Sequence, residues 1–62
     1  MKAIITVEMN NEAFVGYVGN ELARILRRLA DNVDYPDLSA GFRETCVDYN
    51  GNTVGQFVVE ED

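Results

Sequence analysis

The chain has 62 residues, one cysteine, no histidine and a net charge of −6, and 47% of its residues are hydrophobic. This length predicts one domain over residues 1–62, and the hydrophobic content excludes a disordered peptide. The acidic balance argues against direct nucleic-acid binding, and the shortage of histidine and cysteine excludes a zinc site and an internal disulfide.

Composition also sets expectations about compartment and cofactors. No run reaches the ~20 apolar residues that a membrane span requires. The N-terminal residues lack the small-residue cleavage site of a signal peptide, and a lone thiol fits a reducing compartment. We therefore expect a cytoplasmic protein without a cofactor, a metal ion or a membrane partner.

Residues 2–9 alternate between two faces and are rich in β-branched side chains, which predicts a strand. Ile4 lies on the otherwise polar face and indicates that this face is not fully solvated. The following residues, 10–19, contain two glycines and have no clear period. We expect a loop or a short helical turn there, with Phe14 closing the edge of the core.

Residues 20–33 predict the main helix. Asn20 suits the cap, and Glu21 suits the first turn, where the helix dipole favours a carboxylate. Pro36 disfavours helical backbone at the residue before it, so the helix should end first. The apolar residues recur at helical spacing along one stripe: Leu22, Ile25, Leu26, Leu29 and Val33.

Residues 41–59 predict a hairpin, with its turn at Asp48-Tyr49-Asn50-Gly51. The favoured register places Cys46 opposite Val54, whereas a two-residue turn at Asn50-Gly51 would shift one strand and exchange its faces. In the favoured register four side chains meet the helix: Phe42, Cys46, Val54 and Val58. The opposite, open face then carries Val47, Phe57 and Val59 together with Ile4.

The predicted order of elements is therefore strand, helix, strand, strand. A right-handed crossover through the helix makes the first two strands parallel, and the apolar third strand suits the position between them. The expected fold is a single α+β domain of βαββ type. Its three-stranded, mostly antiparallel sheet has the order 1-3-2 and one helix on one face.

Three stretches together carry a resemblance to a known group: residues 11–14 (NEAF), residues 22–31 (LARILRRLAD) and residues 48–55 (DYNGNTVG). They resemble small, mostly uncharacterised bacteriophage and prophage accessory proteins with N-x-A-F, A-R-I-L-R-x-L-A-D and D-x-N-G-N-x-V-G motifs. Cys46-Val47 departs from the leucine and arginine that such relatives tend to carry. The resemblance implies a protein that acts in the cytoplasm of an infected or lysogenic bacterial host.

Two charged groups are candidate contact sites, although ordinary solvated surface is the simpler interpretation of each. An acidic set could meet a basic groove: Asp34, Asp37, Glu44, Glu60 and Glu61. Three helix arginines could hold phosphate oxygens: Arg24, Arg27 and Arg28. The alternative for the arginines is weak pairing with Glu21 and Asp31 on the helix surface.

The open sheet face is the third candidate, as a face for a homodimer or another partner: Ile4, Val47, Phe57 and Val59. We predict no catalytic residue, because no histidine is present to activate Cys46, which is better explained as a core residue. Asp48 is better explained by its turn.

The first functional expectation is a non-enzymatic inhibitor of a bacterial defence or host complex, anti-CRISPR-like, that binds a protein or ribonucleoprotein through its acidic surface. One alternative is a dimeric sponge that sequesters a phosphorylated nucleotide signal. Another is a structural or regulatory subunit with no inhibitory role.

Overall fold

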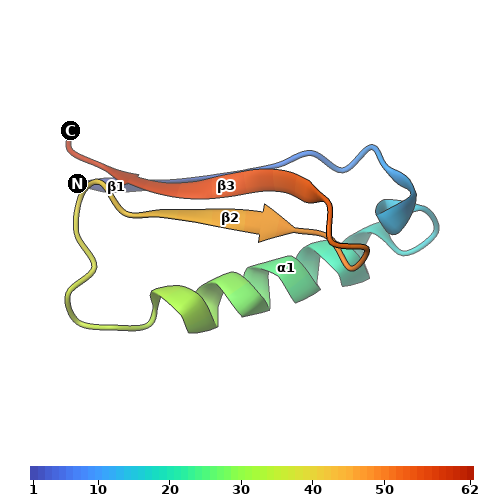
Figure 1. The fold of residues 1–62 in the computed structure, drawn as a ribbon, viewed down its shortest axis with the longest axis horizontal. Helices are drawn as coiled ribbons and strands as arrows, with labels where there is room; N and C mark the ends of the chain where they lie inside the picture. Colours follow the sequence, from blue (N-terminus) through green and yellow to red (C-terminus); the bar gives the residue numbers. More distant parts are fainter.

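The computed structural model describes residues 1–62 and contains a three-stranded antiparallel sheet with one long helix along one side (Figure 1). The sheet order is β1-β3-β2, so β3 lies between two antiparallel neighbours. The predicted βαββ fold and strand order are confirmed. In chain order the elements are β1 (Lys2–Val7), η1 (Glu12–Phe14), α1 (Val18–Val33), β2 (Arg43–Val47) and β3 (Thr53–Glu60).

Helix α1 begins at Val18, two residues before the predicted start. Tyr17 occupies the cap position without a side-chain hydrogen bond, so the prediction that Asn20 caps the helix is wrong. The predicted end is correct, since the helix stops at Val33 ahead of Pro36. This 16-residue helix is too short and too polar to cross a bilayer.

The short 3-10 turn η1 places Phe14 in the core. The Asn11 side chain caps this turn, because its Oδ1 accepts a hydrogen bond from the Ala13 N–H at 3.0 Å. Phe14 is only 1% exposed, the least of any core residue. The prediction of a short helical turn that closes the core edge is therefore confirmed.

The hairpin register follows the prediction only next to the turn. Val47 lies opposite Thr53 as predicted, but Cys46 lies opposite Gly55, and a β-bulge falls between these two pairs. Val54 is the extra residue of this bulge. Because side chains alternate along a strand, one inserted residue reverses the faces of everything beyond it.

The bulge therefore corrects three predicted orientations on β3. Phe57 and Val59 belong to the core cluster beneath the sheet, whereas Val58 lies on the other face, opposite Ile4 and Arg43. The predicted inward positions of Cys46 and Val54 are correct. The full core cluster is Ala13, Phe14, Ile25, Leu29, Cys46, Val54, Phe57 and Val59.

Helix α1 covers only part of the sheet. It contacts η1 and β2 and leaves β1 at the far edge without a helix beneath it (Figure 1). Ile5 shares the helix-side face with its partner Phe57, yet Ile5 is 47% exposed while Phe57 is 5% exposed. Leu26, on the predicted helix stripe, is also 40% exposed.

Candidate functional site

The turn residue Asp48 is buried and connects two distant parts of the chain. Its Oδ1 accepts hydrogen bonds from the N–H groups of Asn50 and Asn52, both at 2.9 Å. Its Oδ2 accepts from the side-chain amides of Asn11 at 2.7 Å and Asn52 at 3.3 Å. Since Asn11 also caps η1, this one carboxylate joins the hairpin turn to η1.

A second buried carboxylate joins α1 to the same hairpin. Glu21 is 6% exposed and accepts two hydrogen bonds from Arg24, at 2.7 and 3.0 Å, and one from the Tyr49 N–H at 2.8 Å. Arg24 also donates to the Val47 carbonyl oxygen at 2.9 Å. The pairing of Glu21 with Arg24 is confirmed, but it is a partly buried pair and not the solvated one that was expected.

The hydrogen bonds determine the ionisation of both carboxylates. The bonds from Arg24 lower the pKa of Glu21 in spite of burial, and Glu21 in turn raises the pKa of Arg24. At Asp48 burial alone would raise the pKa, but the bonds from Asn52, Asn11 and Asn50 outweigh it and lower the pKa. Both groups are therefore ionised and fully engaged near neutral pH, which suits a structural role and not proton transfer.

We expect acid to destabilise the protein through these two groups. A carboxyl group whose pKa is lower in the folded protein than in the unfolded chain stabilises the fold at pH values above its pKa in the unfolded chain, which is near 4. This contribution is lost as the pH falls through the pKa of the folded protein. The thermal unfolding midpoint, followed by circular dichroism, should be level down to about pH 5 and decline below about pH 4. The variant E21Q/D48N should be less stable at neutral pH and show a smaller acid decline. An equal decline in both proteins would contradict this assignment.

The predicted acidic set divides into a group of four and one separate residue. The side chains of Asp34, Asp37, Glu60 and Glu61 are exposed and make no hydrogen bond or ion pair. Glu44 instead lies half-buried on β2 and accepts a hydrogen bond from the Asn32 side chain at 2.9 Å. We call the first four residues the acidic end.

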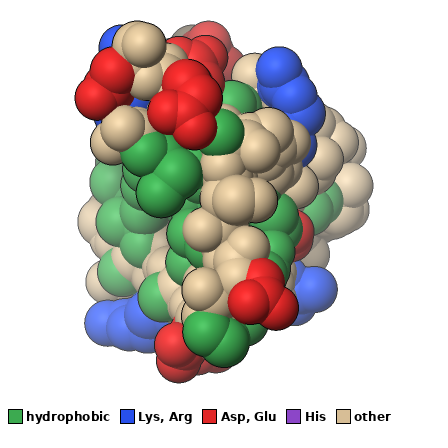
Figure 2. Space-filling view, turned by 90° about the vertical axis from the view of Figure 1, so that its left-hand side faces the viewer, with side chains coloured by type: hydrophobic (Ala, Val, Ile, Leu, Met, Phe, Trp, Pro, Cys, Tyr) green, Lys and Arg blue, Asp and Glu red, His purple; other side chains and the backbone are tan.

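The acidic end is assembled from two segments that are distant in the sequence. The connection after α1 and the end of β3 lie at the same end of the molecule (Figure 1). The Gly41 N–H donates to the Val59 carbonyl oxygen at 2.8 Å and holds the connection to β3. Viewed from this end, acidic side chains lie above and below an area that includes apolar side chains (Figure 2).

The predicted apolar open face loses two of its four residues. Phe57 and Val59 are 5% and 3% exposed in the core. Ile4 lies on the open face, where it is 41% exposed, and half-buried Val47 keeps its predicted side of the sheet, because it follows the inward-facing Cys46 and pairs with Thr53. The bulge is the physical reason, because it turns Phe57 and Val59 inward.

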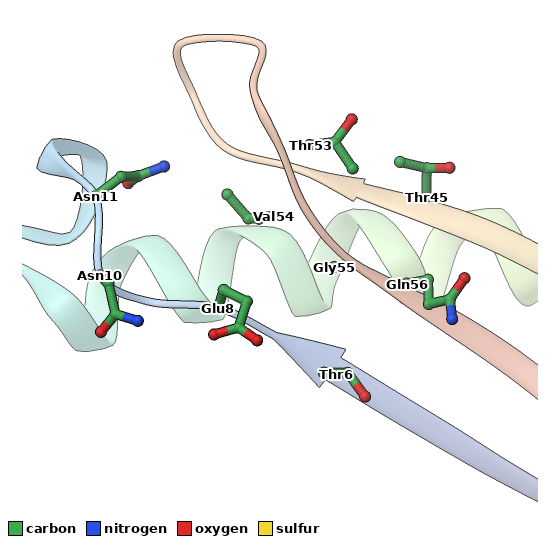
Figure 3. Close-up of a pocket in the computed structure, with 9 residues that line it drawn as sticks. All are labelled: Thr6, Glu8, Asn10, Asn11, Thr45, Thr53, Val54, Gly55 and Gln56. Atoms are coloured by element: carbon green, nitrogen blue, oxygen red, sulfur yellow. The ribbon is translucent and has the colours of Figure 1, made fainter.

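One end of the open face forms a polar hollow (Figure 3). Three polar residues lie side by side across the three strands, because Gln56 of β3 pairs with Thr6 of β1 on one side and with Thr45 of β2 on the other. A polar hollow of this kind does not drive stacking of two sheets through burial of apolar area. Its lining consists of Thr6, Glu8, Asn10, Asn11, Thr45, Thr53, Val54, Gly55 and Gln56.

The three helix arginines differ in availability. Arg24 is engaged by Glu21 and by the Val47 carbonyl oxygen. Arg27 and Arg28 are exposed and form no hydrogen bond or ion pair. The predicted three-arginine phosphate site would therefore have to disrupt the Glu21 pair or use two residues alone.

Sequence reasoning missed an apolar group at the end opposite the acidic one. Val15 and Tyr17 are each 73% exposed and Tyr49 is 62% exposed around a hollow beside the Glu21–Arg24 pair. The only sequence signal for this group was the apolar segment of residues 13–18, which has no helical or strand periodicity and is interrupted by glycine. Exposed tyrosines beside an arginine are typical of protein interfaces.

The single thiol does not provide a nucleophile. Cys46 is 3% exposed in the core, and burial raises its pKa, so the thiol stays protonated. Its interpretation as a core residue is confirmed. No group of three or more histidine, cysteine or acidic side chains is placed to hold a metal ion.

No protein-family model, no curated protein and no solved structure matches this chain. The resemblance to phage accessory proteins stays a prediction. The structure does explain its motifs, because Asn11, Arg24, Asp48 and Asn52 belong to the hydrogen bonds that join η1, α1 and the hairpin.

Proposed function

We propose that this is a non-enzymatic accessory protein of the phage type, which binds a bacterial host or defence complex and inhibits it by occupying a basic groove. The surface that we assign to this contact is the acidic end. A bacterial protein or ribonucleoprotein is the partner that its charge suits, because complementary potentials steer association and select the partner.

The observation that carries the proposal is the position of the acidic end relative to α1. The C-terminal end of a helix has a partial negative charge, which favours basic side chains and disfavours acidic ones. The last turn of α1 has no basic residue, and Asp34 is the residue that caps it. Asp34 therefore does not help the helix to fold, and of the four carboxylates only Glu60 has a basic residue, Lys2, opposite it in the sheet. A role in binding explains the presence of the others.

A binding role is also supported by the other ionisable side chains, because those that could take part in chemistry are already engaged within the protein or buried. Glu21 and Asp48 use their oxygens in hydrogen bonds within the protein, and Cys46 is a protonated core residue. Arg24, the first residue of the alternative phosphate site, is engaged in the same way. No observation favours the nucleotide sponge over the protein-binding role.

We expect the tagged protein to retain a stoichiometric partner from a bacterial lysate, and the variant D34N/D37N to lose it. Removing two of the four carboxylates weakens attraction to a basic surface, so retention should fall at least about ten-fold and the wild-type complex should weaken steeply with salt. Retention is measured by quantitative mass spectrometry at a series of salt concentrations. A second variant, E60Q/E61Q, tests the other segment of the same end.

The matched control is E12Q/D31N, which removes two exposed carboxylates that are not part of the acidic end and has the same net charge as D34N/D37N. It should retain the partner. If both variants lost the partner equally, overall charge and not the acidic end would be responsible. A partner that D34N/D37N and E60Q/E61Q still bind fully would refute the proposed site.

A further inference from the structure

We infer that the exposed edge of β1 pairs with β1 of a second copy of this chain, forming a continuous six-stranded sheet. The inference is independent of the proposed function. β1 is an edge strand that pairs only with β3, and five of its six residues are exposed. It has no proline and no bulge, and four of its six residues are apolar, so this edge is a template for another strand.

Hydrogen bonds within the sheet identify which backbone groups of β1 face outward. The Glu8 N–H donates to the Val54 carbonyl oxygen at 2.7 Å, so Glu8 faces β3. Val59 is the partner of Ala3, but its backbone groups point away from β1: its N–H donates to the Phe42 carbonyl oxygen, and its own carbonyl oxygen accepts from the Gly41 N–H. Because these groups alternate along an antiparallel strand, the N–H and C=O groups of Ala3, Ile5 and Val7 point to the free edge.

These three residues determine the register of a symmetric pair. A two-fold axis at Ile5 places the two Ile5 residues opposite each other and Ala3 opposite Val7 of the second copy. In this register all three outward-facing residues of each copy find hydrogen-bonding partners. The side chains also stay on matching faces, as pairing of twofold-related strands requires.

The same register brings opposite charges together. Lys2 lies opposite Glu8 of the second copy, and the symmetric pair repeats this contact at the other end. Opposite charges directly across two strands stabilise their pairing, and like charges destabilise it. Within its own chain Glu8 makes no salt bridge and its side chain is exposed, so it is available for this contact.

The exposure of Ile5 has an explanation in the pair. This side chain is 47% exposed on the helix side because α1 lies under β2 and not under β1. Across the two-fold axis the two Ile5 side chains come together and cover each other. A directly opposed aliphatic pair of this kind stabilises an antiparallel sheet.

The test compares I5K with I4K by sedimentation velocity over a range of protein concentrations. These neighbouring residues are similarly exposed, at 47% and 41%, but only position 5 lies on the proposed axis. We expect the wild type and I4K to dimerise and I5K to remain monomeric at every concentration, because two lysines would face each other. A monomeric wild type, or loss of the dimer in I4K and not in I5K, would overturn the inference; the second result would assign the contact to the open face.

A charge exchange tests the register and controls for misfolding. E8K places two lysines opposite each other and should weaken dimerisation about ten-fold or more. The triple variant K2E/E8K/E60K restores opposite charges between the two copies, keeps opposite charges at the pair of positions 2 and 60 within each chain, and should recover wild-type dimerisation. Circular dichroism verifies that each variant is folded, and a triple variant no better than E8K would refute the register.

Discussion

Replacement of Gly55 by alanine is expected to disrupt the pairing of β1 with β3 and to remove a large part of the free energy of unfolding. A Cβ atom at this position would lie 1.8 Å from the Thr6 carbonyl oxygen and 2.9 Å from the Val7 Cα. These are backbone atoms of the neighbouring strand, so no side-chain rotation relieves the overlap. Gly55 is also the register partner of both Val7 and Cys46, which places it at the centre of the sheet.

The expected loss for Gly55→Ala is about 3 kcal/mol or more, at the upper end of what overpacking costs. A domain of this length has a free energy of unfolding of about 3–9 kcal/mol, so the loss is a large part of the total. Urea denaturation followed by circular dichroism measures it. The control is Gly19→Ala, because Gly19 lies in α1 with no atom near its Cβ position and should gain about 0.5 kcal/mol from helix propensity. A Gly55→Ala protein as stable as the wild type would contradict the observed strand packing.

Glu21→Gln is expected to lower the free energy of unfolding by about 1–3 kcal/mol. The carboxylate accepts three hydrogen bonds, two from Arg24 and one from the Tyr49 N–H. Glutamine has nearly the same shape but offers one oxygen and one NH2 group, so a donor would face a donor. The loss should be measured by urea denaturation at neutral pH, where the carboxylate is ionised.

The matched control for Glu21→Gln is Asp31→Asn, the same change of acid to amide on the same helix. Asp31 is exposed and forms no hydrogen bond, so its change should stay within about 0.5 kcal/mol. A double-mutant cycle with Arg24→Gln isolates the pair, and its coupling energy should reach about 1 kcal/mol. Additive losses would show that the pair does not act as a unit.

The candidate surfaces differ in how far the sequence alone could predict them. The acidic residues were recognisable from the sequence, but the separation of Glu44 from the other four required the contact with Asn32. The three arginines were equivalent in sequence, and only folding the hairpin against α1 engaged Arg24. The exposure of Tyr17 and Tyr49 had no clear periodic signal, because it depends on where η1 and the turn lie.

The sequence by itself determined the identity and order of the helix and strands, the turn at Asp48 and the strand order of the sheet. These depend on local patterns, namely the helical spacing of residues 22–33, the alternation of residues 2–9 and the geometry of short turns. Only the tertiary structure decided the bulge at Val54, the inward faces of Phe57 and Val59 and the position of α1 under β2. The physical reason is that a bulge and a helix position are stabilised by contacts between distant segments, such as those of Glu8 with Val54 and Asn11 with Asp48. No local pattern contains those contacts.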